Sequence, residues 1–328
     1  MAITPQQKTA LRNTLVDADF SELPNYQRGK VRDSFVLGDG RRIIVSTDRQ
    51  SAFDQILASV PFKGQVLNQT AQFWFNALAD ICDSHVLEYI DPNIVIVSDL
   101  EMLPIEIVVR DYLTGSTNTS IWTMYREGAR DVYGYRLPDG LSKNEKLPKT
   151  LLTPTTKGEN GEHDIPLTKK EIFERALITP RQWDELEVMA FALFDRGKKI
   201  ALKNNLILVD TKYEFGLTRG GRIALADEVH TPDSSRYWDS RTYFSRFLQG
   251  SEPVSLDKEF LRLWIYQRCD PYNEKIPEIP EEVLIEFSEK YISLFETVTG
   301  KNFKKPDINI SVRDRVKQSL KNSFPQYF

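Results

Sequence analysis

One stretch of the chain, residues 206–238, gathers charged side chains whose types and spacing could do chemistry. Two apolar segments of strand length flank a Thr-Arg-Gly-Gly break, a pattern that predicts a β-hairpin. With the turn at that break and regular pairing, Lys212 faces Asp227. Because side chains alternate along a strand, Asp210, Lys212 and Glu214 share one face, and Asp227 joins them.

Three carboxylates and one ammonium on one face make a poor core but suit a metal. Two carboxylates within reach of each other are good Mg²⁺ ligands, because this ion prefers hard oxygen donors and usually keeps substrate phosphates in its shell. The alternative is a solvated outer face of the hairpin. A register slip of one residue would also scatter the set.

The residues that follow this hairpin predict a loop that opens a helix running to Phe247. Pro232 and Asp233 are typical of turns, and a Ser or Asp supplies the N-cap. Hydroxyls, free amide groups and Arg236 at a helix start would form an anion site. The alternative is ordinary capping beside a surface arginine.

Composition bounds the class of protein. The chain has 328 residues, of which 41% are hydrophobic and 27% charged, as in an ordinary soluble globular protein long enough for two domains. A net charge of −4 argues against a nucleic-acid binder. Cys82 and Cys269 form no paired motif, which favours a reducing compartment. We see no apolar signal segment and no run long enough to span a membrane, so we expect a cytoplasmic protein.

Two further segments carry cations beside a glycine. Gly29, Lys30 and Arg32 lie on or before the first strand of a predicted hairpin, where a nucleotide's phosphates could bind. They match neither common phosphate-binding glycine motif, and a solvated basic strand is the alternative. Arg110 ends a predicted strand just before the Gly-Ser turn at Ser116, which is a second candidate anion site or a plain surface turn.

The periodicity of apolar residues predicts the remaining elements. Residues 48–54 are expected to form a polar turn, and the chain after residue 250 is expected to be mainly helical. The predicted strands are 85–90, 93–97 and 104–110, and the predicted helices are 4–16, 65–81, 168–177, 180–203, 256–268, 281–298 and 311–322.

Six motifs, in order between about residues 26 and 250, resemble one family. They are residues 29–33, 47–54, 63–68, 109–116, 210–216 and 227–238. Together they are similar to phosphoribosylaminoimidazole-succinocarboxamide synthase (SAICAR synthetase). This ADP-forming carbon–nitrogen ligase joins L-aspartate to carboxyaminoimidazole ribotide through an acyl phosphate in purine biosynthesis.

The resemblance implies an α+β fold of two lobes. An antiparallel N-terminal lobe of residues 1–110 would resemble that of protein kinases. A C-terminal lobe of residues 111–328, with a helical tail, would resemble ATP-grasp enzymes, and ATP with Mg²⁺ would lie in the cleft. The partners would be small molecules rather than nucleic acid or membrane. Family members include monomers and oligomers, so a homo-oligomer stays open.

The resemblance also assigns roles to individual residues. It implies ATP contacts at Gly29, Lys30, Arg32, Lys157, Glu214 and Asp227, with Glu214 and Asp227 also holding Mg²⁺. It implies substrate contacts at Glu106, Arg110, Ser116, Ser235 and Arg236. It implies catalytic roles for Lys212, Asp210 and Asp233. His163 and Asp164 match a Thr-Lys…His-Asp segment of the family.

The chain departs from the family pattern in two places, and two alternatives to the ligase are considered. Residues 117–125 differ from the common continuation after Ser116, and Asp111 stands where Gly is common. A kinase-like phosphotransferase would share the metal carboxylates and phosphate cations but would not need aspartate to release ADP. A nucleotide-binding scaffold with a dead site would lack one of these groups, and none that we can name is missing.

Overall fold

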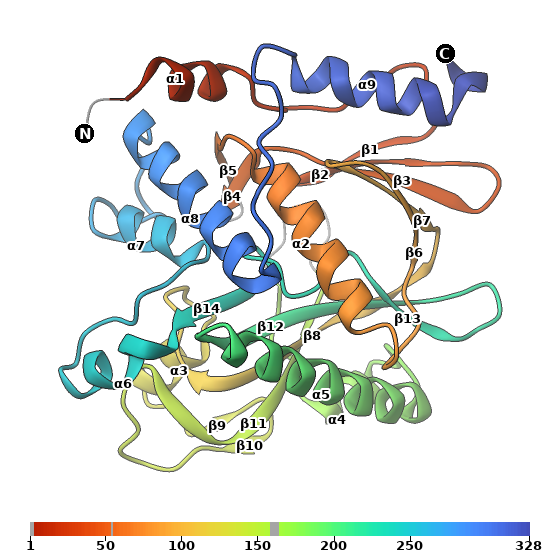
Figure 1. Cartoon of the computed structure of the whole chain (residues 1–328). Coiled ribbons are helices and arrows are strands. Elements are labelled where there is room, and N and C mark those ends of the chain that lie inside the picture. The colour runs from red at the N-terminus through yellow and green to blue at the C-terminus, as the bar shows by residue number, and fades with distance from the viewer. Residues whose placement is uncertain (1–2, 54, 158–163) are drawn as a thin grey trace. The chain divides into compact units, whose positions relative to one another are not determined.

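The computed structural model describes residues 3–53, 55–157 and 164–328 and divides into two compact units. Unit 1 comprises Met1–Asn76, His85–Asp99 and Trp264–Phe328, and unit 2 comprises Ala77–Ser84 and Leu100–Leu263 (Figure 1). This division differs from the predicted boundary at residue 110. Strand β8 (Glu101–Leu113) runs through that residue, and the C-terminal helices belong to unit 1.

Unit 1 is built on an antiparallel five-stranded sheet of order β1-β2-β3-β7-β6, with β4 and β5 as a separate pair. Its strands are β1 (Tyr26–Arg28), β2 (Arg32–Val36), β3 (Arg41–Ser46), β4 (Arg49–Ala52), β5 (Gln55–Ser59), β6 (Val86–Asp91) and β7 (Ile94–Ser98). Its helices are α1 (Pro5–Arg12), α2 (Lys63–Ala77), α8 (Glu281–Thr299), α9 (Val312–Ser323) and the short η1 (Pro325–Tyr327).

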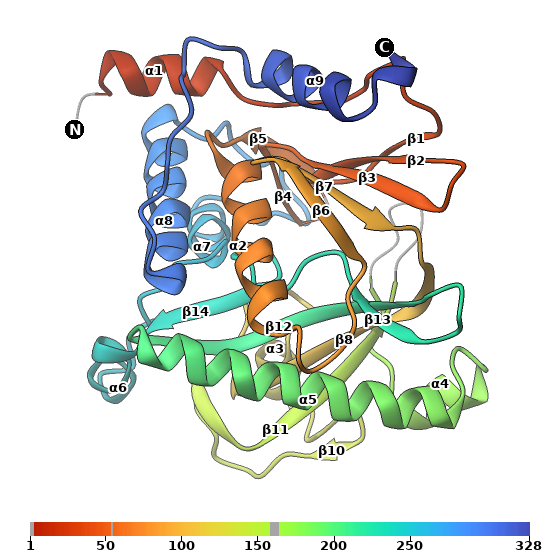
Figure 2. The same cartoon turned by 45° about the vertical axis from the view of Figure 1, so that its right-hand side comes forward.

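Helix α9 covers one face of the unit 1 sheet (Figure 2). Val316 and Leu320 on the helix join Ile43 and Val45 of β3 in one buried cluster, which is what the spacing of apolar residues in a helix and a strand favours. The side chain of Arg315 bonds to Asp91 and Asn93 at the β6–β7 turn, and so fixes the helix along the sheet.

A fully buried ion pair holds the turn that contains Gly29. Arg49 Nη2 and Asp33 Oδ1 are 2.6 Å apart, with both side chains 0% exposed. The same guanidinium donates to the carbonyls of Gly29 and Lys30. A Cβ on Gly29 would lie 2.6 Å from Arg32 O, so only glycine fits there.

Replacing Asp33 with alanine should destabilise the protein by about 3–5 kcal/mol, because Arg49 would remain buried without its charge partner. Urea unfolding measures this. Asp39→Ala, which breaks the half-exposed Asp39–Arg41 pair, is the control and should change stability little. Equal losses of unfolding free energy in the two variants would show that burial does not strengthen the Asp33–Arg49 pair.

Unit 2 is built on the antiparallel sheet β11-β8-β12-β13, in which β14 also pairs with β12. Helix α5, which begins with a Thr179 capping box, packs along β12 and β8 (Figures 1 and 2). Besides β8, its strands are β9 (Asp131–Val132), β10 (Tyr135–Arg136), β11 (Glu145–Thr156), β12 (Leu206–Leu217), β13 (Ile223–Ala226) and β14 (Ser235–Asp239). Its helices are α3 (Ile121–Arg126), α4 (Lys169–Glu174), α5 (Pro180–Lys203), α6 (Ser240–Leu248) and the start of α7 (Glu259–Tyr266).

The predicted hairpin is confirmed, but its register was wrong by one residue. Leu217 pairs with Ile223, because the turn contains one residue more than expected. Strand β13 ends at Ala226, so Asp227 lies beyond the ladder and does not pair with Lys212.

Two other local predictions were wrong. Ser235–Asp239 is strand β14 rather than the start of a helix, because it pairs with β12; the helix begins at Ser240, capped by Asp239. Arg236 therefore lies on a strand and not at a helix N-terminus. The polar turn expected from residue 48 instead contains strand β4, which pairs with β5.

No helix among the described residues is long and apolar enough to cross a membrane.

Candidate functional site

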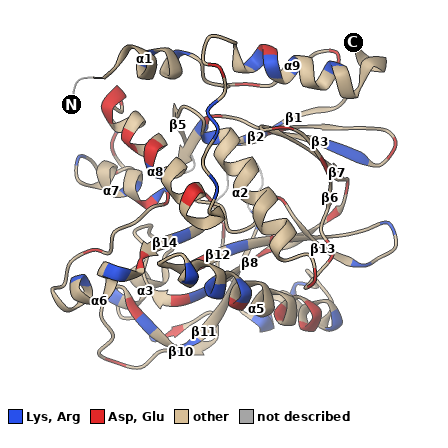
Figure 3. Cartoon of the chain, in the orientation of Figure 1, with Lys and Arg blue, Asp and Glu red and all other residues tan. Residues whose placement is uncertain are grey.

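One face of the unit 2 sheet carries a set of charged side chains from β8, β12 and β14, namely Glu106, Arg110, Asp210, Lys212, Glu214 and Arg236. Figure 3 shows charged bands on these strands. Asp210 pairs across the ladders with Arg110 on one side and Arg236 on the other. Glu214 pairs with Glu106. Strand pairing thus produces two groups. We call them the arginine group, in which two arginines flank Asp210, and the lysine group, which is centred on Lys212.

The lysine group surrounds Lys212. Its Nζ lies 2.5 Å from Glu106 Oε1 and 2.8 Å from Glu214 Oε1. Lys157, at the end of β11, places its Nζ 2.5 Å from Glu214 Oε2. Glu214 is therefore held between two ammonium groups.

Burial makes these charges interact strongly. Glu106 is 5% and Glu214 8% exposed, so the alternative of a solvated hairpin face was wrong. Burial raises the pKa of Glu106 to about 7, although Lys212 opposes the rise. Burial would also raise the pKa of Glu214, but Lys212 and Lys157 hold that pKa well below its usual range. Glu214 is thus an ionised carboxylate.

Asp227 acts on the lysine group from outside the strand. It has a positive φ of 56° directly after β13. Burial lowers the pKa of Lys212, but Glu214, Glu106 and then Asp227 more than offset this and raise that pKa well above its usual value. Asp227 is thus close enough for its charge to act on Lys212, as the prediction required, although the predicted pairing was wrong.

The donor set fits Mg²⁺ bound together with a nucleotide. In residues 3–53, 55–157 and 164–328, no group of three or more His, Cys, Asp or Glu side chains could hold a metal ion. Glu214 and Asp227 offer two hard oxygen donors, one of them firmly ionised. That is the number of protein carboxylates Mg²⁺ commonly takes when phosphates complete its shell.

The arginine group surrounds Asp210. Arg110 Nη1 and Arg236 Nη1 lie 3.1 Å and 2.5 Å from the same oxygen, Oδ2. Arg110 also donates to Thr153 Oγ1 at 2.9 Å. Burial lowers the pKa of Arg236, but Asp210 and Glu259 outweigh it and raise that pKa, so the side chain stays charged. Two guanidinium groups that share one carboxylate leave net positive charge for an anion.

Two residues of the arginine group escaped the sequence analysis. Glu259 Oε2 lies 3.6 Å from Arg236 Nε and 3.3 Å from Arg262 Nη1. Arg236 and Arg262 also hold the pKa of Glu259 down, at about 2, against the effect of its burial. Both residues lie on α7, more than twenty positions from Arg236, and only their i, i+3 spacing could have signalled the pair.

Gly115 and Ser116 lie beside this group. A Cβ on Gly115 would lie 3.3 Å from Arg236 Nη2, and its φ of +114° also favours glycine. Ser116 Oγ is buried, and together with the arginines it lowers the pKa of Glu259. A buried hydroxyl beside arginines can donate to an incoming oxyanion.

The other predicted residues are placed as follows. Ser235 is buried and its Oγ donates to Thr211 Oγ1 at 2.7 Å. Asp233 is buried in the turn before β14, where its backbone N donates to Thr231 Oγ1. Asp164 contributes to the raised pKa of Glu106. His163 lies outside the described residues.

Gly29, Lys30 and Arg32 belong to unit 1. The prediction that they lie on or before the first strand of a hairpin is confirmed, because β2 pairs with β3. Before β2 the chain turns: β1 pairs with β2, and Gly29 N donates to Arg32 O. Gly29 and Lys30 therefore lie in a tight turn, and Arg32 begins β2.

Comparisons with known proteins agree with the family that the sequence motifs resemble. The family model of SAICAR synthetase matches residues 25–279. The phosphoribosylaminoimidazole-succinocarboxamide synthase of Legionella pneumophila (strain Lens) is 47% identical over 90% of this chain and 94% of its own length. That of Bacteroides thetaiotaomicron is 41% identical over 94% of this chain and 98% of its own length.

A solved structure agrees with these matches. The structure of the SAICAR synthase from Saccharomyces cerevisiae, complexed with SAICAR, superimposes with a TM-score of 0.76 at 29% identity and covers 89% of this chain and 100% of that one. The family-model match extends over both units. The chain therefore belongs to the SAICAR synthetase family, the ligases that join L-aspartate to carboxyaminoimidazole ribotide in purine biosynthesis.

Proposed function

We propose that the polar face of the unit 2 sheet carries out this ligation, with ATP as phosphate donor and Mg²⁺ as its metal. The observation that supports it best is the pair of groups on β12: Lys212 among carboxylates, and Asp210 between two arginines. The first suits a metal-bound triphosphate and a reacting carboxylate, and the second suits a phosphate monoester.

The chemistry requires an activated carboxylate. The imidazole carboxylate oxygen attacks the γ-phosphorus of ATP, the bond from that phosphorus to the bridging oxygen breaks, and ADP leaves. The aspartate nitrogen then attacks the acyl carbon, phosphate leaves with the electrons of the C–O bond, and the amine loses a proton. Bound Mg²⁺, held by Glu214 and Asp227, would neutralise phosphate charge.

Residues of this chain would bring the anions together. Arg110, Ser116 and Arg236 would bind the phosphate of the ribotide, and Glu106 would contact the substrate nearby. The side chain of Ser235 bonds to Thr211 on the opposite face of the sheet, so Ser235 would support the site rather than contact the substrate. Lys212 would stabilise the negative charge that builds up on the carbonyl oxygen when the aspartate nitrogen attacks the acyl carbon, because its ammonium is already fixed before the reaction.

Asp210 fits a positioning role better than a direct catalytic one, since both of its neighbours are arginines that it orients. Asp233, in the turn before β14, would also take part in catalysis. Lys157 would contact ATP phosphates next to Glu214. Gly29, Lys30 and Arg32 are proposed as ATP contacts of unit 1.

The finer features of the family complete the proposal. The lobes would be kinase-like and ATP-grasp-like, and the enzyme would act in the cytoplasm. Its partners would be its small-molecule substrates and, in a homo-oligomer, further copies of the chain. One similar relative, the Arabidopsis thaliana synthase that is 47% identical, is described as chloroplastic.

Release of ADP from Mg-ATP, with each substrate omitted in turn, tests the function. We expect release only when ribotide and aspartate are both present, with a new amide product detected by mass spectrometry. Release that does not need aspartate would favour a phosphotransferase. Binding of ATP without release under any condition would favour a scaffold with a dead site.

A further inference from the structure

The loop between β13 and β14 connects the two groups of the site. Asp227 is its first residue, and Arg236 lies just beyond its end, on β14. Asp227 and His230 have positive φ values of 56° and 50°. Residues other than glycine seldom adopt this conformation, and it persists where surrounding contacts impose it.

The contacts of His230 supply such a constraint. Its side chain is fully buried, and its Nε2 shares a 2.5 Å hydrogen bond with Tyr213 Oη. Tyr237 Oη donates to the carbonyl oxygen of His230 at 2.7 Å. We call Tyr213, His230 and Tyr237 the back-face anchor.

Helix α5 makes room for the imidazole. A Cβ on Gly197 would lie 2.3 Å from His230 Cε1 and 2.8 Å from Nδ1, so a larger residue there would displace the ring. Burial lowers the pKa of His230 to about 3, so the ring is neutral and holds the loop by hydrogen bonding and packing rather than by charge.

Tyr213 connects this anchor to the reactive face. It lies between Lys212 and Glu214 on β12, so its side chain points to the opposite face of the same strand. A loop fixed to Tyr213 is therefore fixed relative to Glu214. Two carboxylates that share one metal need that kind of fixed separation.

The second half of the loop has further support of its own. Ser235 N donates to Thr231 O, and Lys212 N donates to Ser234 O, both at 3.0 Å. Arg236 is held by the β12–β14 ladder and by Asp210. Weakening the anchor should thus displace Asp227 more than Arg236.

We propose that His230 is a positioning residue, which sets the Asp227 carboxylate against Glu214 through the back-face anchor and so controls metal–nucleotide binding rather than ribotide binding. The inference rests on the proposed function, because only there is Asp227 a metal ligand.

The test uses the full chain with Tyr213→Phe, which removes one hydroxyl and keeps the ring. Binding of Mn²⁺ with ADP, followed by electron paramagnetic resonance, should weaken by about tenfold or more, as is typical when a group that orients a metal ligand is lost. Ribotide binding, followed by calorimetry, should stay within about twofold. Tyr237→Phe should shift metal binding in the same direction and decides the matter if Tyr213→Phe does not fold.

Tyr125→Phe is the matched control. Tyr125 is also buried and its hydroxyl donates to Pro138 O and accepts from Leu141 N, but it belongs to a different hydrophobic cluster, around α3. It should lower thermal stability and leave Mn²⁺ binding unchanged. Unchanged Mn²⁺ binding in Tyr213→Phe, or equal losses for both ligands, would overturn the inference. If the unaltered protein binds neither ligand, the proposed function fails and the inference fails with it.

Discussion

Glu214→Ala should lower kcat by about 10²- to 10³-fold, the loss typical of removing one preorganised charge from an active site. Glu214 is the carboxylate that two ammonium groups keep ionised, and it is a proposed ligand of the metal. The protein should stay folded, because Lys212 keeps its bond to Glu106. Steady-state ADP release measures the effect, and circular dichroism checks the fold.

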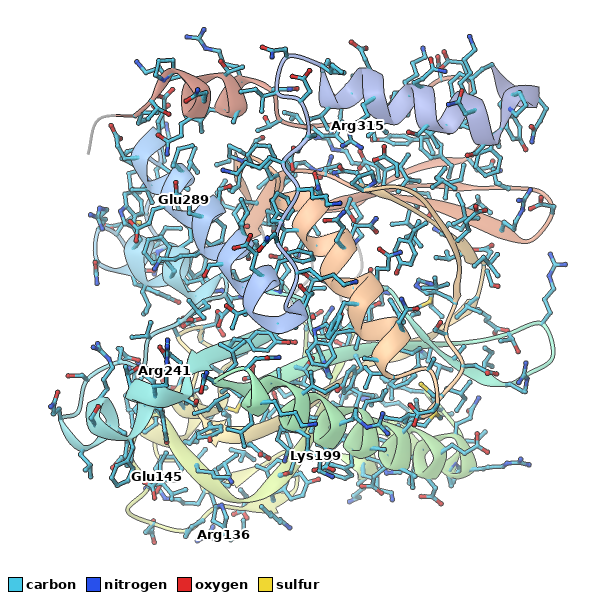
Figure 4. All side chains as sticks on the ribbon, viewed as in Figure 1. Arg136, Glu145, Lys199, Arg241, Glu289 and Arg315 are labelled. Carbon is cyan, nitrogen blue, oxygen red and sulfur yellow. The ribbon has the colours of Figure 1, made fainter. Side chains whose placement is uncertain are left out.

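The matched control is Glu145→Ala. Glu145 lies at the start of β11, away from the polar face, and is labelled in Figure 4; it accepts a hydrogen bond from Ser142 N near the surface. Its loss should leave kcat unchanged. Asp227→Ala should reproduce the effect of Glu214→Ala. A rate equal to that of the unaltered protein in either site variant would refute the metal assignment.

The periodicity of the sequence predicted the strands that carry the site better than it predicted their register. Alternation on β12 alone placed Asp210, Lys212 and Glu214 on one face, and they do share it. The register of the hairpin was wrong, because one more residue in a glycine-rich turn shifts every pair and leaves no trace in periodicity. Asp227 still acts on Lys212 through its charge, although it lies beyond the ladder.

Tertiary pairing explains the largest local error. Residues after Thr231 carry capping residues that favour a helix start, yet β12 offers an open edge, and its hydrogen bonds make Ser235–Asp239 a strand. That pairing brings Arg236 to Asp210, which the neighbouring ladder pairs with Arg110, 100 positions away in the sequence. Local patterns cannot predict such a contact. Glu259 and Arg262 were missed for the same reason.

Arg236→Ala should weaken ribotide binding by about 2–5 kcal/mol, the usual cost of truncating one partner of a buried, hydrogen-bonded charge pair at a binding interface. Arg236 is 13% exposed and bonds to Asp210, so its loss removes a phosphate donor and leaves Asp210 to Arg110 alone. Calorimetry with ribotide and, separately, with Mg-ATP measures the effect. ATP binding should change little, because its proposed contacts lie around Glu214.

A second arginine, at the start of the helix that follows β14, provides the control for loss of charge alone. Arg241, labelled in Figure 4, pairs with Asp239 but is 69% exposed. Arg241→Ala removes the same charge five residues away and should leave both affinities unchanged, because water screens exposed charges. Equal losses of ribotide and ATP in Arg236→Ala would mean that the phosphate site is elsewhere. A loss of ribotide binding alone would support a phosphate site at Arg236, where Asp210 holds the guanidinium. Pairing of β14 with β12 produces this arrangement.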